Sequence, residues 1–361
     1  MQNYIDAIPR LNGKILLGCD GFVDEVYEIV DVRNSLTDYT SIEQLKTFGE
    51  LLVDRADGGV GVEIVHKRRC EGGFAINTGR VAGMLGLKPN LIGLFGEEEL
   101  DLAFSVFSDI CTLHSLGDPA LTLAFEFQDG KVLMSDMKTV ATLTWQDVVS
   151  HFSPEALSEL FSGVEILGLG YWSLTPDFDN LMRGFMEQVD STALPKRMFF
   201  DFADIKKKSP ESFTQSLKLI QGFNEKIPMT LSVNEHEILE LARRLGLEAP
   251  AVEPEAVLAA IRIIREKAGL DELVVHTPTF AVASNATDGE DMALQETQTE
   301  VIRTAGAGDT FNGGYLCASL GDLSVKERLV IANAATAFFV CNATPPNPDQ
   351  LIVQIEKASD R

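Results

Sequence analysis

One stretch of this sequence decides the fold: Val301-Ile302-Arg303-Thr304-Ala305-Gly306-Ala307-Gly308-Asp309-Thr310-Phe311-Asn312-Gly313-Gly314. It begins at the end of a β-branched run, passes through small residues that leave the backbone bare, and enters a helix whose first turn carries Asp309. Backbone N–H groups at a helix N-terminus lack intrahelical partners and the helix dipole favours negative charge there, so the stretch predicts an anion site. A carboxylate at the same end is well placed to act as a base beside a bound phosphate. The alternative is a glycine-rich loop that only turns the chain.

The composition sets limits on the class of protein. The chain has 361 residues, of which 45% are hydrophobic and 23% are charged, which is ordinary for a globular protein. A protein that binds nucleic acid needs a positively charged surface, and the formal net charge of -24 therefore disfavours a nucleic-acid partner. No run approaches the ~18 apolar residues of a membrane span, so we expect no membrane partner.

The five cysteines are scattered, odd in number and without CxxC spacing. This pattern predicts free thiols in a reducing compartment, which places the protein in the cytoplasm, and disfavours a zinc site. The segment Leu16-Leu17-Gly18-Cys19 resembles a lipoprotein cleavage box, but polar residues interrupt the apolar region that would have to precede it. We therefore interpret residues 15–19 as a buried first strand.

Strand and helix signals alternate along most of the chain. Apolar runs predict further strands at residues 91–96, 166–170, 198–202, 229–233 and 273–276. Periodic segments predict helices at residues 41–55 (with Ser41 as N-cap), 73–86, 154–162, 177–190, 235–245, 254–268, 309–320 and 325–341. This alternation indicates an α/β fold with a largely parallel sheet covered on both faces.

A second, smaller sheet is predicted apart from the parallel one. Leu121, Leu123, Phe125 and Phe127 alternate with polar residues, and Asp129-Gly130 is typical of a hairpin turn. Residues 60–64 also alternate as in a strand and are expected to join the same sheet.

Two further segments carry candidate functional residues. Asp20 and Asp24 follow the first strand, where ligands of open α/β sheets bind, and could grip hydroxyl groups; alternatively they are turn residues. The pair Gly72-Gly73 precedes a predicted helix and allows a ligand to approach the backbone closely. Asn77, in the first turns of that helix, would point its amide toward the same ligand site. The alternative is a helix start that needs a tight turn.

In order and spacing, these segments resemble the ribokinase-like (PfkB) carbohydrate kinases over nearly the whole chain. The resemblance rests on an Asp after the first strand, then Gly-Gly…Asn, then Asn234-x-x-Glu237, then Gly-Ala-Gly-Asp-Thr-Phe-Asn-Gly-Gly. It implies a ribokinase-like, Rossmann-type α/β sandwich with a mostly parallel central sheet and a small β-sheet lid. The implied core comprises residues 1–24, 72–118 and 140–361, and the implied lid comprises residues 25–71 and 119–139.

The resemblance also implies an activity and a set of site residues. It implies an ATP-dependent kinase that phosphorylates a hydroxyl, expected to be primary, of a small sugar or sugar acid, with Asp309 as the base. The anion hole would be the backbone of Ala305, Gly306, Ala307 and Gly308. The implied sugar contacts are Asp20, Asp24, Gly72, Gly73 and Asn77. The implied nucleotide contacts are Asn234, Thr277, Gly306, Gly308 and Asn333. Asn234 and Glu237 would organise Mg²⁺ through water. Homodimers through the lid are frequent in similar proteins, and the sequence leaves the oligomeric state open.

Two departures from the family pattern matter. Arg303 stands where an Asp is usual, and in members activated by potassium that Asp helps to hold the ion. A guanidinium cannot coordinate a cation, so we hypothesise that Arg303 itself supplies the positive charge and that activity does not depend on K⁺. The alternative is a solvated Arg303 with K⁺ bound elsewhere. In addition, Thr277-Pro278-Thr279-Phe280 replaces the usual Thr-x-Gly-x-x-Gly beside the nucleotide, which leaves ATP, ADP and GTP as candidate donors.

Other functions stay open at this point. A nucleoside or other small-alcohol kinase would share the fold, and a non-catalytic sugar-binding regulator is a different class, which Asp309, Asn234 and Glu237 argue against. A dinucleotide-dependent oxidoreductase is disfavoured because Gly18-Cys19-Asp20-Gly21 is not G-x-G-x-x-G. His276 is expected to be a hydrogen-bonding residue at a strand end. Tyr171 and Trp172 are expected either at the substrate rim or in the core.

Overall fold

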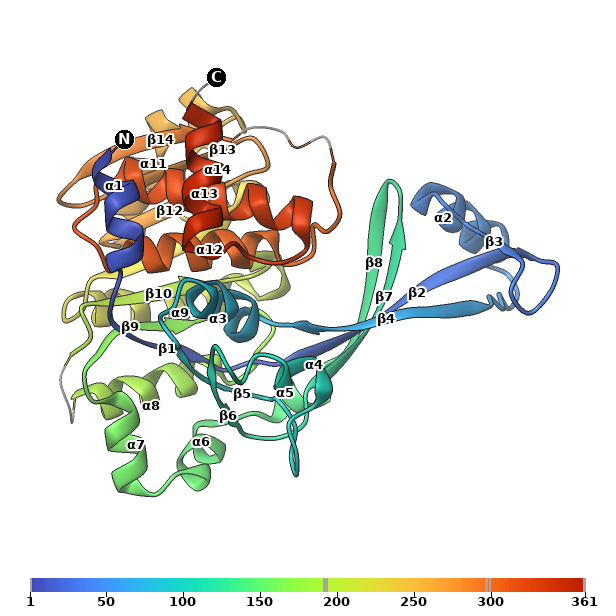
Figure 1. Ribbon diagram of the computed structural model, residues 1–361, viewed down its shortest axis with the longest axis horizontal. Coiled ribbons are helices and arrows are strands. Elements are labelled where there is room, and N and C mark those ends of the chain that lie inside the picture. The colour runs from blue at the N-terminus through green and yellow to red at the C-terminus, as the bar shows by residue number, and fades with distance from the viewer. Residues whose placement is uncertain (1, 191–193, 296–297, 299, 360–361) are drawn as a thin grey trace.

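The large sheet has nine strands among the described residues. The structure, a computed structural model, describes residues 2–190, 194–295, 298 and 300–359 (Figure 1). The spatial order is β14 (Gly289–Leu294), β13 (Phe280–Asn285), β12 (Glu272–His276), β11 (Met229–Asn234), β10 (Arg197–Asp201), β9 (Val164–Leu169), β1 (Lys14–Gly18), β5 (Asn90–Gly93) and β6 (Thr112–Ser115). All neighbours from β12 to β6 pair in parallel, and only β12–β13 and β13–β14 are antiparallel. The predicted α/β class with a mostly parallel sheet is confirmed.

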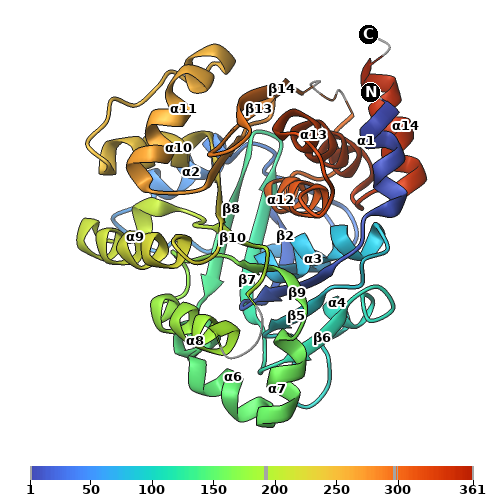
Figure 2. The ribbon, with the colours of Figure 1, turned by 90° about the vertical axis from the view of Figure 1, so that its left-hand side faces the viewer.

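Helices cover both faces of this sheet (Figure 2). One face carries α1 (Gln2–Ala7), α3 (Phe74–Met84), α12 (Ala307–Ala318), α13 (Val325–Asn342) and α14 (Pro348–Ser359). The other carries α6 (Trp145–His151), α7 (Pro154–Phe161), α8 (Phe178–Asp190), α9 (Pro210–Asn224), α10 (Glu235–Arg244) and α11 (Pro254–Ala268). Short elements complete this body: η1 (Ile8–Arg10), α4 (Leu102–Ser105), α5 (Lys138–Thr142) and η2 (Ile205–Lys207). The hydrophobic core accordingly forms two clusters, one on each face.

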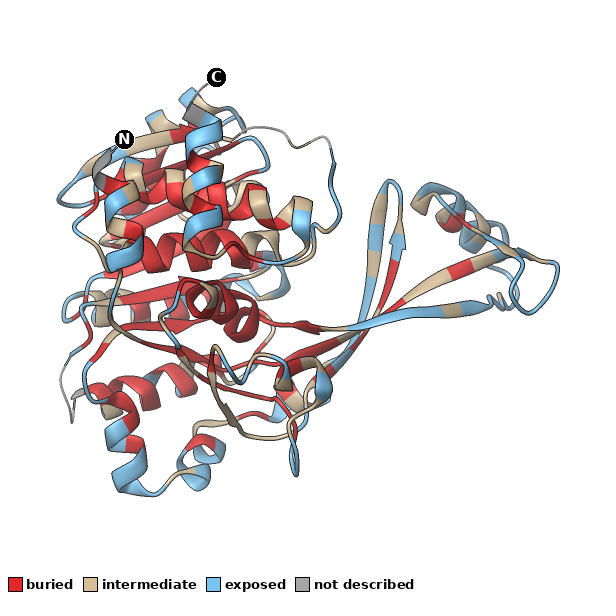
Figure 3. Cartoon of the chain, viewed as in Figure 1, coloured by how far each residue is buried: buried red, intermediate tan, exposed pale blue. Residues whose placement is uncertain are grey.

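The small sheet projects from the side of this body (Figure 1). It contains β2 (Phe22–Arg33), β3 (Tyr39–Ser41), β4 (Ile64–Gly72), β7 (Ala120–Phe127) and β8 (Gly130–Asp136), with α2 (Leu45–Asp54) packed on it. Strand β2 pairs in parallel with β7 and antiparallel with β4. A third apolar cluster of Ile29, Ile42, Phe48 and Phe125 holds α2 in place, and Figure 3 shows how much of this part is exposed.

Several predicted boundaries were wrong, and the errors have local causes. The helix expected at residues 41–55 begins at Leu45, because Ser41 ends β3 and its hydroxyl donates to Glu28 instead of capping a helix. Residues 60–63 lie outside any strand, and β4 begins at Ile64. Strand β2 was missed because Asp24, Glu25 and Glu28 interrupt its apolar alternation, and the antiparallel strands β13 and β14 were also missed.

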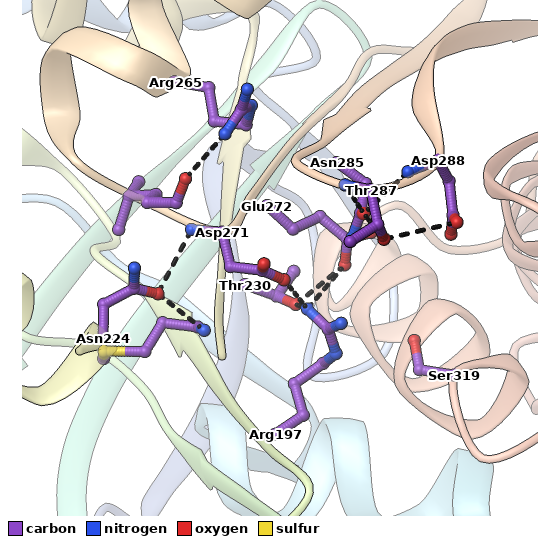
Figure 4. A network of polar contacts seen from close by, with 12 residues as sticks. Arg197, Asn224, Thr230, Arg265, Asp271, Glu272, Asn285, Thr287, Asp288 and Ser319 are labelled. Atoms are coloured by element: carbon purple, nitrogen blue, oxygen red, sulfur yellow. Dashed lines mark hydrogen bonds and ion pairs between the residues drawn. The ribbon is translucent and has the colours of Figure 1, made fainter. Parts of the chain in front are cut away.

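A polar network ties the strands together at the edge opposite the carboxyl ends of the parallel strands (Figure 4). Glu272 is fully buried, and its carboxylate accepts hydrogen bonds from Thr230 (2.8 Å) and Asn285 (3.0 Å). It also forms an ion pair with Arg328 (2.9 Å). Arg197 joins Thr230 to Asp271, at 2.9 and 3.0 Å. Each buried charge has a partner, so the network avoids the free-energy cost of burying an unpaired charge. Its bonds also connect strands β10, β11, β12 and β13 to one another.

Candidate active site

Polar side chains gather where the parallel strands end. Asp20 follows β1, Tyr171 follows β9, Asp201 ends β10, Asn234 ends β11, and His276 ends β12. The carboxyl ends of parallel strands meet at one edge of the sheet, which is where open α/β folds bind ligands. The fold therefore brings residues from five distant parts of the chain to one place.

Asp309 stands at the centre of this group. Helix α12 begins at Ala307 after Gly306, which adopts a left-handed conformation with φ of 85°. In the first turn, Oδ2 of the buried Asp309 accepts hydrogen bonds from Asn77 Nδ2 (2.9 Å) and from the Tyr171 hydroxyl (3.0 Å). Of the aromatic pair Tyr171 and Trp172, only Tyr171 therefore touches the site, since Trp172 lies in the core.

The environment of Asp309 holds the pKa of its carboxyl group near neutral pH. Burial and the negative charge of Asp201 raise its pKa, the hydrogen bonds from Asn77 and Tyr171 and the charge of Arg80 lower it, and the net pKa is about 7. A group with a pKa near the working pH exchanges a proton most effectively.

Asp20 anchors the start of helix α3. Its two carboxylate oxygens accept hydrogen bonds from the backbone N–H groups of Phe74 (2.7 Å) and Ala75 (2.9 Å). A Cβ at Gly73 would lie 3.0 Å from Asp20 Oδ2, and Gly73 has a φ of 110°, so only glycine suits this position. Burial raises the pKa of Asp20 to about 7. Asp20 is thus an anchor for a helix rather than a simple turn residue.

Asp24 lies on β2 and faces the loop before α12. It lines a small cavity between the small sheet and the body, whose other walls include Cys70, Lys131, Arg303 and Ala305. A Cβ at Gly72 would lie 3.2 Å from Asp24 Oδ1, so the first glycine of the pair makes room for this carboxylate. Burial raises the pKa of Asp24 to about 6, against the lowering effect of a hydrogen bond from Thr122.

The loop before α12 is held from two sides. The Nε of Arg303 donates to the carbonyl oxygen of Ala305 (3.1 Å), and its Nη1 pairs with Glu71 (3.1 Å). On the other side, a Cβ at Gly308 would lie 3.1 Å from the ring of His276. The small residues of this loop therefore meet a packing need, and the N–H of Ala307 donates to the carbonyl oxygen of Thr304 (3.1 Å).

His276 itself has a structural role. Its ring lies 5.0 Å from the ring of Phe311, and burial lowers its pKa to about 4, so it stays neutral.

Asn234 and Glu237 form a capping box at the start of α10. Asn234 Oδ1 accepts from the N–H groups of His236 (2.9 Å) and Glu237 (3.0 Å), and Glu237 Oε2 accepts from the N–H of Asn234 (2.9 Å). Both residues line a cavity of about 230 Å³ together with Asp204 and Lys206. Burial raises the pKa of Glu237 well above its usual value, and the charge of Asp201 raises it further.

Sequence reasoning missed Asp201. Its carboxylate accepts from the backbone N–H of Ala203 (2.6 Å) and from Asn312 Nδ2 (2.7 Å), and burial raises its pKa to about 6. It ends the apolar run Met198–Phe200, and a carboxylate just after a parallel strand is the same signal that singled out Asp20.

The family model of the prokaryotic ketohexokinases matches residues 6–357 of this sequence. The chain belongs to the prokaryotic ketohexokinase family. A curated ketohexokinase of Haloferax volcanii is 29% identical over 348 residues, which covers 94% of this chain and 90% of that protein. The protein is therefore a sugar kinase, a phosphotransferase with an alcohol group as acceptor, and the resemblance to the ribokinase-like carbohydrate kinases is confirmed.

Solved structures support the fold of this ketohexokinase-family chain. A ribokinase of Arabidopsis thaliana, solved with ribose and ATP, has a TM-score of 0.65 at 15% identity and covers 95% of this chain and 98% of its own. A nucleoside kinase of Methanocaldococcus jannaschii has a TM-score of 0.63 at 16% identity, covering 96% and 98%.

Two predicted nucleotide contacts, Asn333 and Thr277, make other hydrogen bonds in this structure. Asn333 donates to the carbonyl oxygen of Ala293 (3.1 Å) and lines a separate cavity of about 490 Å³ between α13, α14 and β14. Thr277 is engaged in its own turn, where its hydroxyl donates to the carbonyl oxygen of Phe280 (2.9 Å). Within the described ranges, no cluster of three or more His, Cys, Asp or Glu residues could hold a metal, and no helix is long and apolar enough to cross a membrane.

Proposed function

We propose that this sugar kinase transfers the terminal phosphoryl group of ATP to a primary hydroxyl of a ketohexose such as fructose. Asp309 acts as the base, and the backbone N–H groups of residues 305–308 receive the phosphoryl group. The family membership and the curated relative support a ketohexose as acceptor. The contacts and the raised pKa of Asp309 support its role.

The proposed mechanism rests on the position of the Asp309 carboxylate. This carboxylate lies in the first turn of α12, so a phosphoryl group bound at that helix N-terminus would stand beside the base. As the sugar hydroxyl attacks phosphorus, Asp309 takes its proton, and the N–H groups stabilise the charge on the phosphoryl oxygens. Phosphoryl transfer needs this positioning and charge balance more than covalent catalysis.

We further propose that the sugar lies between the small sheet and the body. Residues 25–71 and 119–139 would then form a lid over a core made of residues 1–24, 72–118 and 140–361. Asp24 is the best-placed sugar contact, because it lines the cavity beside Ala305. Asn77 donates a hydrogen bond to Asp309, and Asp20 accepts hydrogen bonds from the start of α3. These two residues and the glycine pair Gly72-Gly73 would therefore form the walls of the sugar site.

The residues near α10 fit a magnesium ion bound through water. Asn234 Oδ1 and Glu237 Oε2 are engaged in the capping box, which leaves Glu237 Oε1 to contact a hydrated ion. The negative charges of Asp201, Asp204 and Glu235 raise the pKa of Glu237, and a divalent cation would relieve that repulsion. When bound, Mg²⁺ would offset the charge of the ATP phosphates. Asn234, Thr277, Gly306, Gly308 and Asn333 remain the proposed nucleotide contacts.

We propose that Arg303 replaces a potassium ion. Its guanidinium donates to Ala305 inside the catalytic loop, so a positive charge is already fixed there. Activity should therefore stay constant when K⁺ is titrated against a bulky organic cation at constant ionic strength. Strong activation by K⁺ would refute this role of Arg303.

We also propose a location in the cell and an oligomeric state for the protein. The five cysteines are free, in keeping with a cytoplasmic location. Exposed Leu121 and Met134 on the small sheet are compatible with a homodimer through the lid. A monomeric mass in sedimentation at micromolar concentration would contradict that dimer.

The experiment that tests the function is a phosphorylation screen followed by one substitution. The wild-type protein should phosphorylate a ketohexose with ATP in a panel of ketohexoses, aldoses, pentoses, sugar acids and nucleosides, with ADP and GTP as alternative donors. Asp309→Asn should lower kcat by roughly 10²- to 10⁴-fold and leave sugar and ATP binding in calorimetry unchanged. Asp349→Asn, which also removes a carboxylate from the first turn of a helix, should have no effect. Comparable activity in Asp309→Asn would refute the base, and turnover of nucleosides alone would refute the acceptor.

A further inference from the structure

A cluster of two arginines and one glutamate lies against the catalytic loop. Glu71, at the end of β4, pairs through Oε1 with Arg80 of α3 and with Arg303 (3.1 Å). Both guanidinium groups lie over the ring of Phe339 of α13, with Cζ at 4.9 Å for Arg80 and 5.7 Å for Arg303. Two cations share one carboxylate, so the cluster keeps one positive charge in surplus.

Arg80 is the buried member of the cluster and is not satisfied. Only 3% of the residue is exposed, and its Nε and Nη2 have no hydrogen-bond partner among the described residues. Arg265, another buried arginine, has partners for Nε, Nη1 and Nη2. Leaving buried donors unpaired is costly, and natural proteins tolerate it mainly where the group serves a function.

The unpaired side of Arg80 faces the loop that would hold the phosphoryl group. Its Nη2 lies 3.4 Å from the position that a Cβ of Gly306 would take, and the side-chain amide of Asn77 lies 3.5 Å from the same point. Asn77 in turn holds Asp309. Arg80 therefore lies beside the loop at Gly306 and next to Asn77, the residue that orients the base.

We infer that Arg80 is a positioning residue for phosphoryl transfer, which holds a fixed positive charge behind the loop of residues 305–308. The inference deepens the proposed function and rests on it. A charge fixed in a buried setting attracts the developing phosphoryl charge more strongly than one in water, and it needs no reorganisation during the reaction. Glu71 orients the guanidinium, and Arg303 closes the cluster on the side of Ala305.

Substitution and chemical rescue test this role. Arg80→Met keeps the length and removes the charge, so kcat should fall by roughly 10²-fold or more while KM for the sugar changes little. Arg80→Lys should restore part of kcat. Arg80→Ala enlarges a cavity of about 190 Å³ that Arg80 already lines, so added guanidinium should raise its kcat, whereas urea, a neutral molecule of the same shape, should not.

Arg265→Met is the matched control, because it removes a buried arginine on α11 that is fully paired. It should lower stability without changing kcat of the folded protein. Wild-type kcat in Arg80→Met, or equal rescue by urea and guanidinium, would overturn the inference. If none of the Arg80 variants folds, Glu71→Gln provides the test. It removes the ion pairs with both arginines and should lower kcat at constant KM. An unchanged kcat would overturn the role of Arg80.

A nucleotide-binding measurement separates this inference from the proposed function. If the wild-type protein phosphorylates no ketohexose, the proposed acceptor fails. The role of Arg80 is then judged by calorimetry with a non-hydrolysable ATP analogue and with ADP. Arg80→Met should weaken binding of the analogue more than binding of ADP, because only the analogue carries the terminal phosphate. Equal weakening would overturn it.

Discussion

At the scale of single residues, the proton affinity of Asp309 results from opposing neighbours. Burial and the charge of Asp201 raise its pKa, while Asn77, Tyr171 and Arg80 lower it, and the balance is a value of about 7. Each neighbour can be changed separately, so the sign of each contribution can be measured.

We predict that kcat rises with pH through a limb near pH 7, because Asp309 must lose its proton to act as a base. Asp201→Asn removes a negative charge and should move the limb to lower pH. Tyr171→Phe removes a hydrogen bond to the carboxylate and should move it to higher pH, by roughly half a unit to one unit. The measurement is the pH profile of kcat at saturating substrates. Shifts of the same sign in both variants would contradict this account.

The sequence predicted Asp309 but not the group around it, and the reason is physical. Asp309 lies in a local motif whose small residues are visible in the chain. Asp201 and Tyr171 come near Asp309 only because β9 pairs with β1 and β10 pairs with β9 in the sheet, and no local sequence pattern predicts this pairing. Likewise, Arg303 was recognised as unusual, but its ion pair with Glu71 depends on the path of β4.

At the scale of elements, the start of α10 combines a structural and a chemical task. The capping box of Asn234 and Glu237 satisfies N–H groups that the helix leaves free, and the same two side chains line the cavity proposed for the hydrated metal. A substitution that keeps the hydrogen bond but removes the charge separates these tasks.

Glu237→Gln is that substitution. A glutamine oxygen can accept the hydrogen bond from the N–H of Asn234, so the melting temperature should change little. The apparent dissociation constant for Mg²⁺ in the kinase assay should rise by about 10-fold or more. The control is Glu327→Gln, which changes the equivalent residue of the capping box on α13 and should leave Mg²⁺ dependence unchanged. Unchanged Mg²⁺ dependence in Glu237→Gln would contradict the proposed site.

Elements of the large sheet were predicted well because they are buried on both faces and read as apolar runs. Strand β2 was missed because only four of its twelve positions are buried, and its charged residues interrupt the apolar alternation. The parallel pairing of β2 with β7 joins segments about a hundred residues apart, so it had to be observed.

At the scale of the whole molecule, the strongly acidic chain concentrates buried carboxylates at one site. Burial raises the pKa of Asp20 and Asp309 to about 7, and that of Asp24 and Asp201 to about 6, from 3.8. The folded chain therefore keeps protons that the unfolded chain releases between about pH 4 and pH 7.

The ligand-free protein should accordingly become less stable as pH rises. A group whose pKa is raised by folding stabilises the fold below its unfolded pKa, and that contribution is lost as pH passes through the folded value. The melting temperature should be several degrees higher at about pH 6 than at about pH 8. Asp20→Asn retains an acceptor for α3 and should flatten this dependence. A melting temperature that rises from pH 6 to pH 8 would contradict it.

The parallel pairing of β2 with β7 also bears on how the chain is made. Residues 22–27 leave the ribosome well before residues 120–125, their partners, and in the meantime β4 covers only one edge of β2. A bare strand edge is a template for pairing with another chain, and charged residues are a known protection against it. Asp24 and Glu25 lie within that waiting edge, so their charges should also keep the unfinished chain from aggregating during synthesis.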